Sequence, residues 1–145
     1  MIEIRNRSAY HEFAIEDTYT AGMVLVGTEV KALRAGKASF NDSYCIFHQG
    51  ELFIKSLHIS EYSFGTTQRH EPLQERKLLL TRRELKKMET KMTEKGYTIV
   101  PLKIFFNEKN LAKIQIGLGK GKKLHDKRES IKKRDTEREI KRYLK

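Results

Sequence analysis

The chain has 145 residues and carries 30 Lys and Arg against 19 Asp and Glu, which gives a formal net charge of +11 at pH 7. This length suits one compact domain with an extension, and the positive charge favours a nucleic-acid partner. No apolar run reaches the ~18 residues that a membrane span needs, and the amino terminus lacks the apolar stretch of a signal peptide. The single cysteine, Cys45, cannot form an internal disulfide and is expected to be buried. We therefore expect a soluble, cytoplasmic protein without a membrane partner.

The first third of the chain predicts strands followed by a short helix. Residues 13–27 are rich in strand-forming side chains. A helix is expected from about Glu29 to Ala35, ended by Gly36. Val30 and Leu33 would face inward on this helix. The outward side would then carry three cations, which fit either a solvated face or a set of RNA phosphate contacts: Lys31, Arg34 and Lys37.

Two hairpins are predicted farther along the chain. The first covers residues 43–59, with Gly50 supplying the unusual dihedral of the turn. The second covers residues 97–118, with a turn at 107–110, and Pro101 marks a bend or bulge in its first strand. Alternate side chains of both strands are apolar, which indicates one buried face. The side chains predicted to share that face are Val100, Leu102, Ile104, Phe106, Ala112, Ile114, Ile116 and Leu118.

A second helix is predicted between the hairpins. Thr81 and Glu84 have the spacing of a capping box, an apolar stripe follows, and Gly96 is expected to end the segment. The elements together indicate a mainly β protein of about six antiparallel strands with two or three helices. Short antiparallel strands of this number favour a closed or nearly closed barrel of the oligonucleotide-binding type. We place this barrel domain at residues 1–118 and a basic tail at residues 119–145.

The tail holds much of the charge. Residues 119–145 contain 12 Lys and Arg against 5 Asp and Glu, so about +7 of the net charge lies there. Its apolar residues form no single stripe that could dock it onto the barrel. Opposite charges at i,i+4 spacing nevertheless favour a helix once the excess charge is neutralised. We expect the free tail to be disordered and to become helical on a polyanion.

No motif indicates a catalytic, cofactor or metal site. The run GLGKGKK at residues 117–123 lacks the spacing of a Walker loop. Its glycines fit a flexible exit from the last strand, with lysines that either reach phosphates or belong to a solvated linker. The histidines are scattered, and one cysteine cannot form a CxxC zinc motif. Four carboxylates are interpreted as surface charge, and we expect no enzymatic activity: Glu12, Glu16, Asp17 and Glu29.

Three further residues leave alternatives open. His11 fits either contact with an RNA base or a hydrogen-bonded strand histidine. Arg76 and Lys77 fit either a solvated face or phosphate contacts, and both are taken as candidate RNA contacts.

Five strings of residues, in order between Asn6 and Glu139, resemble one known family. Together they resemble the small protein B (SmpB) family, whose members bind tmRNA in bacterial trans-translation. The resemblance implies an oligonucleotide-binding barrel that binds the tRNA-like domain of tmRNA and delivers it to stalled ribosomes. There the tail would lie in the empty mRNA channel beyond the decoding centre. The strings are NRSAYHEF, GTEVKALRAGKASFNDSY, RKLLLTRREL, KGYTIVPLKIFF and GKGKKLHDKRESIKKRDTERE.

The resemblance also implies partners and site residues. Elongation factor Tu and alanyl-tRNA synthetase would be indirect partners through tmRNA, and the bound protein would be a monomer. Thr20 departs from the family pattern, where a glutamate is expected, and Ser8 and Tyr10 stand where basic residues are common. The residues implied in RNA contact are Asn6, Arg7, His11, Lys31, Arg34, Lys37, Lys120, Lys122 and Lys123. The tail residues implied in ribosome contact are His125, Asp126, Lys127, Arg128 and Arg134.

Two rival functions fit the same composition. The first is a general ribosomal-RNA-binding barrel protein whose extension threads into ribosomal RNA. The second, with less support, is a small ribonuclease or an RNA-modifying enzyme. Selective binding of the tRNA-like domain and the absence of turnover without ribosomes would separate the adaptor from both.

Overall fold

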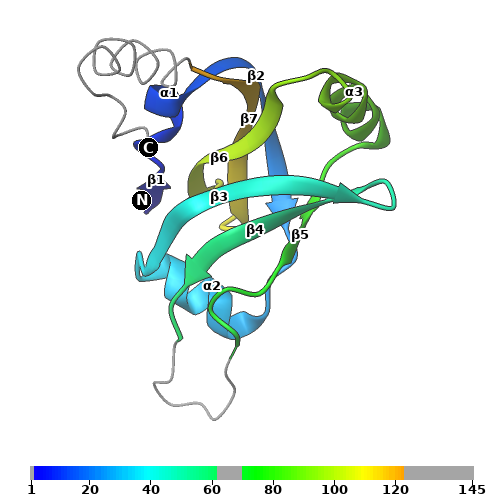
Figure 1. The fold of residues 1–145 in the computed structure, drawn as a ribbon. Coiled ribbons are helices and arrows are strands. Elements are labelled where there is room, and N and C mark those ends of the chain that lie inside the picture. The colour runs from blue at the N-terminus through cyan, green and yellow to red at the C-terminus, as the bar shows by residue number, and fades with distance from the viewer. Residues whose placement is uncertain (1, 62–69, 123–145) are drawn as a thin grey trace, which may run out of the picture.

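A computed structural model describes residues 2–61 and 70–122, and it forms a closed antiparallel barrel (Figure 1). Six strands close the ring in the order β6, β3, β4, β5, β2 and β7, because β7 pairs again with β6. The short strand β1 adds to β6 outside the ring. The predicted mainly β barrel is therefore confirmed. The elements are β1 (Glu3–Arg5), α1 (Ala9–Glu12), β2 (Phe13–Met23), α2 (Gly27–Arg34), β3 (Ala38–His48), β4 (Glu51–Ile59), β5 (Arg76–Leu79), α3 (Arg82–Met92), β6 (Tyr97–Phe106) and β7 (Ala112–Gly121).

Both predicted hairpins are confirmed. Strands β3 and β4 are joined by Gln49 and Gly50, whose φ angles of 54° and 79° are those of a two-residue turn with both residues left-handed. Strands β6 and β7 pair from Tyr97 opposite Lys120 to Phe106 opposite Ala112. Local turn chemistry thus sets the register of the β3–β4 hairpin.

The barrel interior is filled by apolar side chains from the strands and from two helices. Leu85 and Met88 of α3 and Leu33 of α2 belong to the same buried cluster as the strand residues. Cys45 is a free, buried thiol in this core, as predicted, and its burial raises the pKa of the thiol. The strands contribute most of the cluster, with Leu52, Ile54, Leu57, Ile59, Leu78, Ile99, Ile104, Ile114, Ile116 and Leu118.

A bulge in β6 corrects the predicted buried face of the second hairpin. The pairing of β6 with β7 shifts register between Pro101 and Lys103, so the bend predicted at Pro101 is confirmed. Ile104 lies in the main core, whereas Val100 and Leu102 lie in a separate buried cluster with Ala9 of α1. The prediction that Val100 and Leu102 share a face with Ile104 is wrong, because the extra residue reverses the alternation.

Two of the three glycines predicted to form a flexible exit, Gly117 and Gly119, are packing residues. A Cβ on Gly117 would lie 2.9 Å from Ile15 Cγ2, and a Cβ on Gly119 would overlap the carbonyl oxygen of Ala14. These glycines let β7 approach β2 closely. Strand β7 runs to Gly121, three residues beyond the predicted end of the barrel domain at residue 118.

The predicted helices are present with shifted ends. In α3, Thr81 Oγ1 accepts from the Glu84 amide at 3.1 Å, and Glu84 Oε1 accepts from the Thr81 amide at 3.0 Å, which confirms the capping box. This helix ends at Met92, and Gly96 lies in the following turn. No helix within residues 2–61 and 70–122 is both long and apolar enough to cross a membrane.

Candidate nucleic-acid interface

The described candidate RNA contacts, apart from Arg76 and Lys77, form two groups at opposite ends of the β2–β7 pair. Phe13, which follows α1, pairs with Gly121 at one end of β2, and Gly22 pairs with Lys113 near the other. At ~3.3 Å per residue, the 11 residues of β2 span on the order of 35 Å. Figure 1 shows α1 and α2 far apart on the barrel. We call the two regions the α1 end (Arg7, His11, Lys120 and Lys122) and the α2 end (Lys31, Arg34 and Lys37).

Asn6 shapes the α1 end from within. Its backbone amide donates to the Leu102 carbonyl at 2.9 Å, and its side-chain Nδ2 donates to the Pro101 carbonyl at 2.8 Å. Its Oδ1 accepts from Ser8 Oγ at 3.2 Å. The side chain is half-buried and fastens the segment before α1 to the bulge of β6. Asn6 therefore positions the neighbouring residues.

Arg7 and His11 are exposed at the α1 end. His11 lies on α1 and not on a strand, so the alternative of a hydrogen-bonded strand histidine is wrong. Neither side chain makes a hydrogen bond or ion pair with any other residue of the described ranges. Tyr10, which stands where basic residues are common in the family resembled, is also exposed and retains 55% of its accessible surface. An exposed phenol ring beside an arginine and a histidine is suited to stacking on a base.

Lys120 and Lys122 complete the α1 end. Lys120 Nζ lies 4.9 Å from the ring centroid of Tyr97, and the Tyr97 hydroxyl donates to Glu16 Oε1 at 2.7 Å. This hydrogen bond to the carboxylate raises the pKa of the Tyr97 phenol. The Lys122 amide donates to the Glu12 carbonyl at 2.7 Å, which fastens the end of the described chain to α1. Both lysine side chains are exposed.

A pocket of about 200 Å³ opens beside α1, and sequence reasoning did not find it. Tyr44, at its edge, is 39% exposed, and Asp42 has the unusual φ of 56° at a register shift in β3. Nothing local in the sequence indicates a pocket, because its walls come from three separate segments. They include Asn6, Ser8, Glu12, Asp42, Tyr44 and Thr98.

The α2 end carries its cations on the outward side, as predicted. Lys31, Arg34 and Lys37 are all exposed. The Arg34 guanidinium lies 5.1 Å from the centroid of the Phe106 ring, and its Nη2 donates to the Asn110 carbonyl at 3.3 Å. Arg34 is therefore oriented by the β6–β7 turn while it remains accessible to a ligand.

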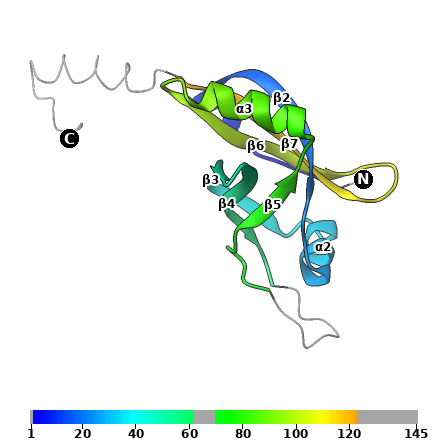
Figure 2. The same cartoon turned by 90° about the vertical axis from the view of Figure 1, so that its right-hand side faces the viewer.

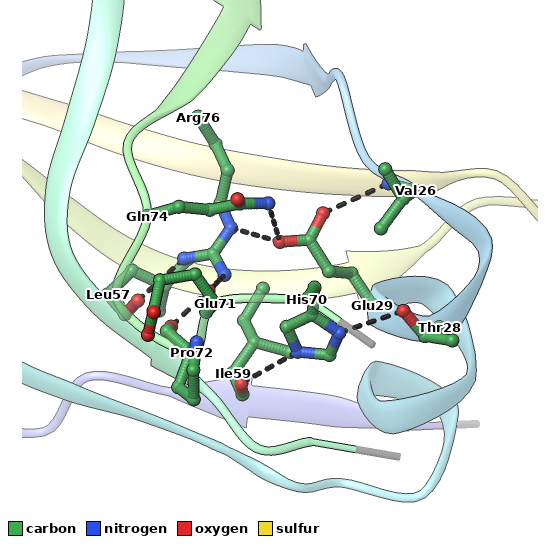
Figure 3. Close-up of polar contacts among 10 residues, drawn as sticks. All are labelled: Val26, Thr28, Glu29, Leu57, Ile59, His70, Glu71, Pro72, Gln74 and Arg76. Carbon is green, nitrogen blue, oxygen red and sulfur yellow. Dashed lines mark hydrogen bonds and ion pairs between the residues drawn. The ribbon is translucent and has the colours of Figure 1, made fainter. Parts of the chain in front are cut away.

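Arg76 is not available to RNA, and the prediction that it contacts phosphate is wrong. The residue is 2% exposed, and its Nε donates to Glu29 Oε2 at 2.6 Å inside the protein (Figure 3). Its remaining nitrogens donate to the carbonyls of Leu57, Glu71 and Pro72 at 2.7–3.2 Å. Glu29 is 1% exposed, so its interpretation as surface charge is wrong as well.

The Glu29–Arg76 pair belongs to a polar network that anchors α2. Glu29 Oε1 accepts from the Val26 amide at 3.0 Å, and Oε2 also accepts from Gln74 Nε2 at 2.8 Å. A second bridge runs through His70, whose ring nitrogens lie 2.9 Å from Thr28 Oγ1 and 2.9 Å from the Ile59 carbonyl. Two consecutive helix residues are thus fastened to β4 and to the segment before β5, which fixes the rotation of α2 and the direction of its cations (Figure 3).

The remaining candidates fall outside the two ends. Lys77 is partly exposed on β5, with its Nζ 3.6 Å from Glu51 Oε1, so part of its charge is compensated. No group of three or more potential metal ligands occurs in the described part of the chain. Six candidates lie outside the described residues: Lys123, His125, Asp126, Lys127, Arg128 and Arg134.

Comparison with known proteins identifies the family. The family model described as SmpB protein matches residues 3–145. An SsrA-binding protein of Phocaeicola vulgatus is 51% identical over 144 residues, which cover 99% of this chain and 96% of the relative. An SsrA-binding protein of Geobacter sulfurreducens is 51% identical over 135 residues, covering 93% and 88%. A chain of the solved structure "tmRNA-SmpB: a journey to the center of the bacterial ribosome" aligns with a TM-score of 0.72 and 46% identity, covering 85% of this chain and 86% of that one. The chain belongs to the SmpB protein family.

Proposed function

We propose that this protein is a non-enzymatic RNA-binding adaptor that binds the tRNA-like domain of tmRNA and delivers it to stalled ribosomes. The observation that carries the proposal is the likeness to SsrA-binding proteins, at about half identity over nearly the whole chain. The solved relative, which pairs SmpB with tmRNA, has the same fold over 85% of this chain. The described residues supply what such a partner needs, namely exposed cations without carboxylate partners at the α1 end.

The barrel would contact the RNA at two places. At the α2 end, Lys31 and Arg34 of the helix and Lys37 just after it would neutralise phosphates, because exposed cations act on the nucleic-acid backbone and carry no base preference. At the α1 end, Lys120 and Lys122 would do the same, while exposed rings offer stacking surfaces for unpaired bases. Two contacts at the ends of a rigid barrel would recognise the shape of the folded RNA.

The tail, residues 119–145 in the sequence prediction, would serve the ribosome. Its excess of cations suits ribosomal RNA, and its residues His125, Asp126, Lys127, Arg128 and Arg134 would line the empty mRNA channel. The peptide-transfer chemistry would belong to the ribosome. Elongation factor Tu and alanyl-tRNA synthetase would meet this protein only through tmRNA, in the cytoplasm, with one protein bound per RNA.

A gel-shift titration tests the proposal against a general RNA-binding role. The labelled probes are the tRNA-like domain of tmRNA and an RNA duplex of equal length. We expect clearly tighter binding to the tRNA-like domain, with a log–log salt slope of about −0.7 to −0.9 per phosphate neutralised. Equal affinity for both probes would favour the general ribosomal-RNA-binding protein. Product formation from RNA in the absence of ribosomes would favour an enzyme.

A further inference from the structure

The pocket beside α1 is lined by two carboxylates that have no cationic partner in the described chain. Glu12, at the end of α1, and Asp42, in β3, both belong to its lining. Neither side chain makes a hydrogen bond or an ion pair with another residue of the ranges 2–61 and 70–122. Two uncompensated carboxylates thus share one pocket in a chain whose net charge is +11. The pocket is therefore suited to a cationic group.

The other groups of the pocket narrow the kind of cation. Tyr44 lines the same pocket and is 39% exposed. An aromatic ring beside carboxylates favours a guanidinium over an ammonium group, because the planar guanidinium stacks on the ring and can bind a carboxylate with two nitrogens. The volume of about 200 Å³ is smaller than the ~300–1,000 Å³ of most small-molecule sites. The pocket therefore fits the head of one arginine side chain.

The described chain ends at the wall of this pocket. Gly121 pairs with Phe13, which also lines the pocket, and the Lys122 amide donates to the Glu12 carbonyl at 2.7 Å. In Figure 2, β7 ends at the top of the view and α2 lies below the barrel. The residues that follow Lys122 therefore start beside the two carboxylates and far from the α2 end.

The tail offers an arginine within reach of the pocket. Arg128, which lies outside the described residues, is the first arginine after Lys122 and follows it by six positions. Six residues span roughly 13 Å as a flexible chain and at most ~20 Å when extended. A tether this short gives an effective concentration on the order of millimolar, so a contact too weak to form between separate molecules is populated within one chain. One side chain can thus hold the tail without an apolar stripe.

We propose that, in the free protein, the pocket beside α1 holds the guanidinium of Arg128 between Glu12 and Asp42 and against the Tyr44 ring. The tail then folds back on the barrel until an RNA withdraws it, because an RNA offers the cations of the tail many phosphates in place of two carboxylates. This contact goes beyond the proposed function, since it concerns the protein before it meets RNA. A tail held in this way is less available to non-cognate RNA.

Paramagnetic relaxation measured on the free, full-length protein tests the contact. A nitroxide is attached at Ser130→Cys, two residues after Arg128, and Cys45 does not take up the label because it is buried in the core. We expect strong broadening of the backbone amide signals around Asp42. Arg128→Gln should reduce the broadening to the level that the tether alone produces, whereas Arg138→Gln, the matched control, should leave it unchanged. Equal broadening in these two variants would overturn the assignment of Arg128 to the pocket.

A second pair of variants tests the pocket side of the contact. Glu12→Gln combined with Asp42→Asn should abolish the excess broadening. The control is Glu89→Gln combined with Glu108→Gln, which removes the same charge from exposed carboxylates that do not line the pocket, and it should keep the broadening. The amide spectrum of each variant also reports whether the barrel remains folded. Broadening that survives in the folded pocket variant would overturn the proposal.

Binding to a non-cognate RNA duplex tests the consequence. A binding-competent state that is only partly populated lowers the apparent affinity by its populated fraction, so release of the tail should tighten duplex binding by about two- to fivefold. The unlabelled pocket variant, Glu12→Gln with Asp42→Asn, is compared by gel shift with the control, Glu89→Gln with Glu108→Gln. Tighter binding by the pocket variant supports the contact, and equal affinity of the two variants would overturn its regulatory role.

Discussion

The two ends of the barrel hold their cations by different means. At the α2 end, a buried ion pair between Glu29 and Arg76 joins the helix to β5 across 47 residues of chain. At the α1 end, the fixing contacts are uncharged hydrogen bonds, including that from Asn6 Nδ2 to the Pro101 carbonyl, and the close approach of β7 to β2 at Gly119. The α2 end thus depends on a buried ion pair, whereas the α1 end depends on uncharged hydrogen bonds and on the absence of a side chain at Gly119. Substitutions that damage one end should therefore leave the other intact.

Removal of the tail should give the largest functional effect. The truncated protein keeps both ends of the barrel, which are proposed to bind tmRNA, but loses the segment proposed to contact the ribosome. Truncation after Lys123 is expected to abolish peptide tagging on stalled ribosomes. Affinity for the tRNA-like domain should stay within about tenfold, roughly 1.4 kcal/mol, since both ends of the barrel remain. Tagging is measured in a reconstituted translation system, and affinity by gel shift. Loss of both activities together would contradict the division between barrel and tail.

Substitution of Arg76 should give the largest loss of stability. Arg76→Met leaves the buried Glu29 carboxylate without its cation and removes the donors of three carbonyls, so we expect a loss of about 3–5 kcal/mol in the free energy of unfolding. The matched control is Lys77→Met on the same strand, where the lost ion pair is at the surface and should cost less than about 1 kcal/mol. Urea unfolding measures both variants. Equal losses would show that the buried network does not hold α2.

A methyl group at Gly119 should disturb the α1 end to a smaller degree. Gly119→Ala places a Cβ against the Ala14 carbonyl, so β2 and β7 must separate locally, and a loss of about 1–3 kcal/mol is expected. Gly121→Ala is the control, because no atom lies within 4 Å of a Cβ built there. Thermal unfolding of the two variants gives the comparison. A neutral Gly119→Ala would mean that the glycine provides flexibility and not close packing.

The smallest expected effect is a pH dependence at Tyr97. Its phenol pKa is raised by the hydrogen bond to Glu16, so the bond stabilises the fold below the ordinary pKa of about 10 and is lost as pH rises through the raised value. Tyr97→Phe keeps the ring beside Lys91 and Lys120 but lacks the hydroxyl. Wild type should be slightly more stable than this variant at neutral pH, and the difference should vanish in strong base. A difference that persists there would contradict the role of the hydroxyl.

Features with a local signal could be predicted from the sequence. The capping box at Thr81 and Glu84, the turn at Gly50 and the alternation in β7 each depend on residues close together in the chain. The chain-long resemblance supplied the family and most candidate contacts. The outward direction of Lys31, Arg34 and Lys37 followed from the same helical periodicity.

Features that depend on distant pairings could not be predicted. Arg76 looks like a surface cation until the fold places it against Glu29, and no local pattern indicates that pairing. Gly119 looks like a linker glycine until β2 passes beside it. Pro101 indicated an irregularity in β6, but the reversal of the strand face at Leu102 follows from the register against β7, without any interruption of the apolar pattern. In each case the deciding neighbour lies far along the chain.

Footprinting of the tRNA-like domain tests the two-ended interface most directly. The RNA is probed with hydroxyl radicals in complex with wild type, with a variant in which Lys31, Arg34 and Lys37 are Gln, and with one in which Arg7, Lys120 and Lys122 are Gln. Wild type should protect two separate backbone segments, and each variant should lose a different one while the other segment stays protected. Loss of the same segment by both variants, or of neither, would contradict recognition by the two ends of the barrel.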